Sequence, residues 1–250
     1  MPHRRTLAAL AFTVSFVASC DQGPSRAEPD PAAAPAASSS SAAPPAPAAP
    51  DPPRAPDIIV DKANVSVGLD RVPADAPGLL DKIAVFLVGR PAVEGRAVDV
   101  VAMRNARPSA VAAAVAALRH AKASAAGVKT ETRDGATQRI PLSFASAEQE
   151  CTAIAWIARD DAIDVWRAGG GKAKRVVKGL AGPDMTLGTD AVRAQQAECE
   201  AGDLVVGADD AVTWGLLFDL AYESLHSRWS RAGAVRLVTN AVPGRKLALE

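Results

Sequence analysis

The chain has 250 residues, and its 28 lysines and arginines are equal in number to its 28 aspartates and glutamates. The basic residues are scattered among acidic ones, whereas proteins that bind phosphate backbones cluster lysine and arginine. This balance argues against nucleic acid as a partner.

The beginning of the chain has the three parts of a bacterial export signal. Arg4 and Arg5 precede an apolar run of thirteen residues, Leu7 to Ser19, that ends in small residues. The segment Val17-Ala18-Ser19-Cys20 resembles a lipobox, which implies a signal peptide over residues 1–19 and a lipid on Cys20. An ordinary cleaved signal or an uncleaved anchor is the alternative, although thirteen helical residues rise only about 20 Å, short of a bilayer core of about 30 Å.

Residues 20–56 are expected to form a disordered tether. From Asp21 to Pro56 the chain is almost entirely alanine, proline and serine, and it holds 11 of the 19 prolines. Without isoleucine, leucine, valine or aromatic side chains, it has nothing to bury against the entropy cost of ordering. Extended as polyproline II at about 3.1 Å per residue, the 36 residues after Cys20 would reach about 110 Å.

Residues 57–140 have the pattern of a first small α+β unit. Two short strands flank a turn at Asp61-Lys62, and the spacing of apolar residues predicts a helix over Pro77 to Val88. The pattern continues with a strand at 98–103, a helix from Ser109 to Ala126 that Gly127 stops, and a strand at 128–132.

Residues 141–250 repeat this order of elements. Ile157, Ile163 and Val165 stand 98 residues after Ile59, Val65 and Val67. The remaining elements are an insertion at 169–185 with the pattern of a strand at 175–178, a helix at 190–200, a strand at 203–208, a helix at 213–232 stopped by Gly233, and a strand at 235–238. We therefore predict an α+β fold of two tandem units, each a small mixed sheet with two helices on one face.

Cys151 and Cys199 are the two cysteines that remain if Cys20 is acylated. An even pair of cysteines in an exported chain indicates a disulfide, which would close a loop of 49 residues. A catalytic thiol would need a nearby base, and a metal site would need more ligands than two cysteines with His120 or His226 supply. We predict no metal and no cofactor.

The clearest family pattern lies in the second unit. A strand that ends in Ala208-Asp209 is followed by Trp214-Gly215, a helix that contains Asp219, and Ala232-Gly233 before the last strand. This order resembles the periplasmic domain of the ExbD/TolR family of energy-transduction proteins. The first unit keeps the spacing but has Met103-Arg104 in place of Ala-Asp.

The resemblance implies a partner-binding envelope domain that works as a dimer, so that the two units are expected to form an intrachain pseudo-dimer. Family members take part in proton-driven work through an aspartate in a transmembrane helix. The apolar stretch Leu7–Ser19 contains no carboxylate, so the resemblance does not extend to proton coupling.

Asp209, Asp210 and Trp166 are the candidate partner-binding residues. Capping of the following helix is the alternative role for the two aspartates, and burial in the core, as expected for most of the tryptophans, is the alternative for Trp166. The glycines and lysine at 169–172 lack the other residues of a phosphate-binding loop and predict a turn.

These observations together predict a non-enzymatic, lipid-anchored protein of the cell envelope that faces the periplasm. It would be a binding or assembly component of a biopolymer-transport or Tol-type complex, with envelope proteins or peptidoglycan as partners. One alternative is a peptidoglycan-binding lipoprotein. Another is a divergent hydrolase that uses Asp209 or Asp210 with His226, which requires these groups within reach of a hydrogen bond or one bridging water. The sequence leaves open which membrane holds the anchor.

Overall fold

The computed structural model describes residues 54–144, 151–197, 199, 202–228, 230 and 232–247. The strands are β1 (Ile58–Val60), β2 (Asn64–Val67), β3 (Asp70–Pro73), β4 (Ala97–Ala102), β5 (Ala125–Glu131), β6 (Thr137–Leu142), β7 (Ala153–Ile157), β8 (Ile163–Arg167), β9 (Lys174–Val176), β10 (Gly202–Ala208) and β11 (Ala232–Leu237). The helices are α1 (Leu79–Leu87), α2 (Pro108–His120), α3 (Met185–Gln196) and α4 (Trp214–His226). Cys20, with the signal peptide, and Trp229 lie outside the described residues.

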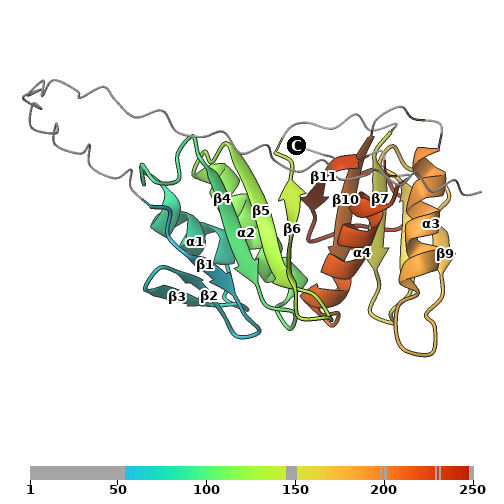
Figure 1. The fold of residues 1–250 in the computed structure, drawn as a ribbon, viewed down its shortest axis with the longest axis horizontal. Coiled ribbons are helices and arrows are strands. Elements are labelled where there is room, and N and C mark those ends of the chain that lie inside the picture. The colour runs from blue at the N-terminus through green and yellow to red at the C-terminus, as the bar shows by residue number, and fades with distance from the viewer. Residues whose placement is uncertain are drawn as a thin grey trace, which may run out of the picture. The chain divides into compact units, whose positions relative to one another are not determined.

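All eleven strands belong to one continuous mixed sheet, in the order β3-β2-β1-β4-β5-β6-β11-β10-β7-β8-β9 (Figure 1). The prediction of two separate small sheets is therefore wrong. Strand β6 makes the difference, because it pairs antiparallel with β5 along its length and parallel with β11 at Leu142 and Val235. The sequence pattern did not predict β6, since Pro141 lies within it and proline usually interrupts a strand.

The strands on either side of the β6–β11 junction repeat one order. In the first half of the sheet, β1 pairs antiparallel with β2 and parallel with β4, and β4 pairs parallel with β5. In the second half, β7 pairs in the same way with β8 and β10, and β10 pairs parallel with β11. The first half comprises β1–β6 with α1 and α2, and the second half comprises β7–β11 with α3 and α4.

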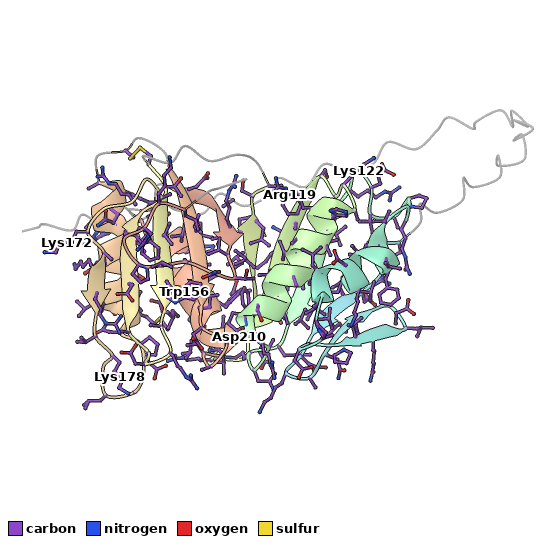
Figure 2. All side chains as sticks on the ribbon, turned by 180° about the vertical axis from the view of Figure 1, so that it is seen from behind. Arg119, Lys122, Trp156, Lys172, Lys178 and Asp210 are labelled. Atoms are coloured by element: carbon purple, nitrogen blue, oxygen red, sulfur yellow. A yellow bond between two sulfur atoms is a disulfide. The ribbon has the colours of Figure 1, made fainter. Side chains whose placement is uncertain are left out.

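Helices lie on both sides of the sheet. Figure 1 shows α3 and α4 on the near side, and Figure 2, from behind, shows α1 and α2 on the other side. Right-handed crossovers between parallel strands place both helices of each half on one side. Near the junction the sheet is covered on both faces, because the consecutive residues Leu204, Val205 and Val206 of β10 are all buried.

Two predicted helices end earlier than the sequence pattern suggested. α2 ends at His120 and α4 at His226, while Gly127 and Gly233 lie inside β5 and β11 instead of stopping helices. A Cβ atom at Gly127 would collide with the guanidinium of Arg139 on the neighbouring strand β6. Gly127 therefore lies under a neighbouring side chain in the sheet and does not end a helix.

α4 shows how the core forms. Trp214, Leu217, Phe218 and Ala221 are buried at intervals of three and four residues, the spacing of one apolar helix face. The indole N–H of Trp214 donates to the hydroxyl oxygen of Thr130 in the first half at 2.8 Å, so the largest core side chain of α4 also crosses the junction. In the described part of the chain, no helix is both long and apolar enough to span a membrane.

The predicted disulfide is present. Cys151, next to β7, is bonded to Cys199, which lies between α3 and β10, with Cα atoms 5.8 Å apart. The bridge therefore holds the chain together where α3 returns to the sheet.

Replacing both Cys151 and Cys199 by serine should lower the free energy of unfolding by up to about 4 kcal/mol, because the unfolded chain loses a constraint on a long loop. Chemical denaturation under oxidising conditions measures the difference. Wild-type protein in a reducing agent is the control and should unfold like the double variant. Equal stability of the oxidised wild type and the double variant would contradict this account.

Candidate functional site

The two halves hold each other by equivalent contacts. Arg104 lies two residues after β4 and Asp210 two residues after β10, and Ser109 and Gly215 are each the second residue of the helix that follows. The N–H of Gly215 donates to the Arg104 carbonyl oxygen at 2.8 Å. Conversely, the Asp210 carboxylate accepts from the N–H of Ser109 at 3.1 Å and from its hydroxyl at 2.6 Å. The two contacts thus join equivalent positions of the two halves in both directions.

The carboxylate of Asp210 stabilises a helix of the other half. α2 has no side-chain cap of its own, so Asp210 places a negative charge at its positive end. Figure 2 shows Asp210 beside the first turn of α2, with Arg119 at the other end of that helix. Capping is thus a structural role of Asp210, although the capped helix is α2 and not the following helix α4.

Arg104 makes the strongest polar contact between the halves. Its Nη1 and Nη2 atoms donate to the two carboxylate oxygens of Asp219 at 3.0 and 2.7 Å, a bidentate pair. Nη1 also donates to the carbonyl of Glu131 at 3.1 Å, and Arg133 lies 3.2 Å from the same carboxylate. Hydrogen bonding to Asp219 raises the pKa of Arg104. The Asp219 side chain is 12% exposed and that of Arg104 is 29% exposed, so this pair is partly shielded from solvent.

A cleft of about 670 Å³ opens beside this ion pair, between the β5–β6 turn, the loop before α3, and α4. Its walls thus come from both halves. The lining combines carboxylates with apolar groups: Thr132, Arg133, Asp134, Gln138, Gly179, Ala181, Gly182, Pro183, Asp184, Met185, Thr186, Asp219, Tyr222 and Glu223. We take this cleft as the candidate functional site and call it the larger cleft.

Besides Asp219, α4 contributes Tyr222 and Glu223 to the lining of the larger cleft. The Tyr222 ring stacks between Phe218 and His226, with ring centroids 5.9 and 4.0 Å apart. Partial burial raises the pKa of the Glu223 carboxyl above its ordinary value of 4.5, nearby Asp219 raises it further, and Arg133 lowers it. The cleft therefore offers an aromatic surface next to a carboxylate whose charge is incompletely compensated.

A second cleft of about 560 Å³ lies between the loops that follow β4 and β10. Lys62, Arg107 and Arg159 line it together with Asp209 and Asp210. It sits at the carboxyl ends of parallel strands, where open α/β sheets commonly bind ligands. Both predicted aspartates line this cleft. One carboxylate oxygen of Asp209 accepts from the N–H of Ala211 at 2.8 Å.

The third predicted residue, Trp166, is not on the surface. It is 1% exposed, in a small core with Ile154, Ala168 and Val205 on the second face of the sheet. Its indole N–H donates to the carbonyl of Arg245 at 2.9 Å. The expectation of a Trp166 contact surface is therefore wrong, because the C-terminal segment packs over it. The glycines before Lys172 form the predicted turn between β8 and β9.

The hydrolase arrangement is not formed. Asp209 and Asp210 precede α4, whereas His226 is the last residue of that helix, and twelve helical steps separate its ends by about 18 Å. The Nδ1 atom of His226 instead lies 2.9 Å from the carbonyl oxygen of Tyr222. Within the described residues, no cluster of three or more histidine, cysteine, aspartate or glutamate side chains could hold a metal ion.

Comparisons of the chain with protein-family models, with curated proteins and with solved structures find no match. The resemblance to the ExbD/TolR family and the lipid on Cys20, which lies outside the described residues, therefore stay predictions.

Sequence reasoning did not single out Arg104, Tyr222 or Glu223 as site residues. The sequence did contain one signal for Arg104. At this position the first unit has Met103-Arg104, whereas the second unit has Ala208-Asp209. Asp219, the partner of Arg104, was also noted as the aspartate within the predicted helix. Nothing in the sequence related the two, since they lie 115 residues apart.

Asp219→Ala should lower the free energy of unfolding by about 2–3 kcal/mol, because it leaves the partly buried Arg104 guanidinium without its bidentate acceptor. Urea unfolding measures this. Asp190→Ala is the matched control, since Asp190 pairs with Arg193 in an exposed ion pair within α3, and its effect should stay within about 0.5 kcal/mol. Similar losses in both variants would contradict the assigned importance of the Arg104–Asp219 pair.

Glu223→Gln should stabilise the protein at pH 7. Below the ordinary value of 4.5 the carboxyl is protonated in both folded and unfolded chains and contributes no difference. As the pH rises, the unfolded chain ionises first, so the raised pKa penalises the folded state at neutral pH. Unfolding curves of wild type and variant at pH 4 and pH 7 test this, and a difference of the same size at both pH values would contradict it.

Proposed function

We propose that this chain is a non-enzymatic lipoprotein of the cell envelope, facing the periplasm, that acts as a binding or assembly component of a biopolymer-transport or Tol-type complex. The lipobox-like segment before Cys20 supports the anchor. The Cys151–Cys199 disulfide supports an oxidising compartment, because such bonds persist outside the cytosol.

The observation that carries the proposal is the pair of half-sheets joined by reciprocal contacts. Subunits of a symmetric dimer contact each other in this way, with residue i of one touching residue j of the other and the reverse. We infer that the two halves form an intrachain pseudo-dimer. Two units within one chain can carry different residues at equivalent positions. Arg104 and Asp210 occupy such positions and have opposite charges.

The larger cleft is the proposed binding site for a partner segment. It is open, lies across both halves, and offers the ring of Tyr222 and the side chain of Met185 beside the carboxylates of Asp134, Asp184 and Glu223. Side chains with an apolar stem and a charged head, such as lysine or arginine, suit a surface of this kind. A partner segment that carries such side chains would fit it.

Lipid attachment can be tested directly. In a bacterial host fed an alkyne fatty acid, the full chain should incorporate the label, and Cys20→Ala should not. A double variant, Cys151→Ala with Cys199→Ala, is the control and should keep the label if the protein accumulates. Labelling of Cys20→Ala, or none of the wild type, would refute the anchor.

Partner binding can be tested with a photo-crosslinking amino acid at Tyr222. It should form an adduct with another envelope protein, while the same group at Leu69, which is fully exposed on the β2–β3 turn, should not. Purified protein should also fail to sediment with cell-wall sacculi. Sedimentation with sacculi and no protein adduct would favour the peptidoglycan-binding alternative.

A further inference from the structure

Arg236 of β11 is an unusual residue at the junction between the halves. It is 8% exposed, and its Nε and Nη2 atoms have no hydrogen-bond partner among the described residues. Buried charges are normally paired, because burial removes the water that stabilises them. A guanidinium also stays protonated at any pH a protein meets, so it cannot escape the cost by losing its proton.

The two unpaired atoms lie on the same edge of the planar guanidinium. Nε–H and Nη2–H on this edge point in parallel, which is the geometry that receives both oxygens of a carboxylate or two oxygens of a phosphate. The free edge of Arg236 therefore matches one class of ligand, the oxyanions, better than water or a single carbonyl.

The surroundings of Arg236 reinforce this reading. It follows Val235, the residue that joins β11 to β6, and it stands beside Val205 of β10. Burial lowers the pKa of Arg236, the carboxylate of Asp203 raises it, and the positive charge of Arg119 on α2 lowers it. Asp203 nevertheless forms no hydrogen bond with the free edge of Arg236, so Nε–H and Nη2–H remain without an acceptor among the described residues.

We propose that Arg236 binds an oxyanion, a carboxylate or phosphate group, at the junction between the halves. The ligand accepts from Nε–H and Nη2–H together and replaces the water that burial removed. Its source is either a small free oxyanion or the terminal carboxylate of a peptide. This site is separate from the larger cleft and does not depend on the proposed function.

Titration of the full chain, carrying Cys20→Ser so that it stays soluble, tests the proposal. Sodium phosphate, sodium acetate and sodium chloride are added separately at constant ionic strength and pH 7. The Nε–H resonance of Arg236 should shift and saturate with phosphate or acetate but not with chloride, and Tm should rise in parallel by mass action. No saturable shift with either oxyanion, and none with the peptide described below, would overturn the proposal.

A peptide arm distinguishes the two sources. A short peptide with a free C-terminal carboxylate is compared with the same peptide amidated. Tighter binding of the free acid than of acetate assigns the site to a peptide terminus, whereas equal affinity assigns it to a small oxyanion. Binding of both peptide forms with equal affinity would contradict recognition of an oxyanion.

Arg236→Lys separates the effect of the paired N–H donors from the effect of the positive charge. Lysine keeps a positive charge but loses the paired donors, so the oxyanion should bind at least about tenfold more weakly, the loss expected for one charge-assisted hydrogen bond. Arg175→Lys is the matched control, because Arg175 already donates to Asp164 and Asp160 at 2.7 and 2.6 Å, and it should leave binding unchanged. Unchanged binding in a folded Arg236→Lys variant would also overturn the proposal.

Discussion

The Arg104–Asp219 ion pair joins the two halves directly, beside a hydrophobic core to which both halves contribute. The sheet alone joins them weakly, because β6 and β11 meet at one residue pair, Leu142 with Val235. The bidentate contact adds two partly buried, charge-assisted hydrogen bonds across the junction. The hydrogen bond from Trp214 to the first half acts beside it. Together these contacts position α4, and α4 forms one wall of the larger cleft.

The repeated topology is combined with unequal chemistry at equivalent positions. After β10, the carboxylate of Asp210 caps α2 of the other half, as a negative charge at a helix N-terminus does. After β4, Arg104 stands in the equivalent place and reaches past the start of α4 to Asp219. A Cβ atom at Gly215 would lie 3.0 Å from the Arg104 side chain, so glycine gives the arginine room to pass. The repeated pattern therefore places different charges at equivalent positions of the two halves.

Polar groups without full compensation gather in the second half and at the junction. Arg236 has two unpaired nitrogen atoms, and the buried hydroxyls of Thr189 on α3 and Ser224 on α4 also lack partners among the described residues. Glu223 carries a raised pKa beside Asp219. Stable proteins usually satisfy such groups internally, and exceptions concentrate where a protein binds something. Of these groups, Glu223 lines the larger cleft, whereas Arg236 lies on β11 beside the β6–β11 junction.

Local patterns in the sequence determined the order of the strands and helices apart from β3 and β6, the repeat, and the Cys151–Cys199 pair, because apolar spacing and cysteine number are properties of the chain itself. Only the tertiary structure decided that the strands form one sheet, that Gly127 belongs to a strand, and that Trp166 is covered. Each of these depends on contacts between residues far apart in the chain, such as Gly127 with Arg139. The larger cleft was hidden for the same reason, since its walls come from the β5–β6 turn, the loop before α3, and α4, which only folding brings together.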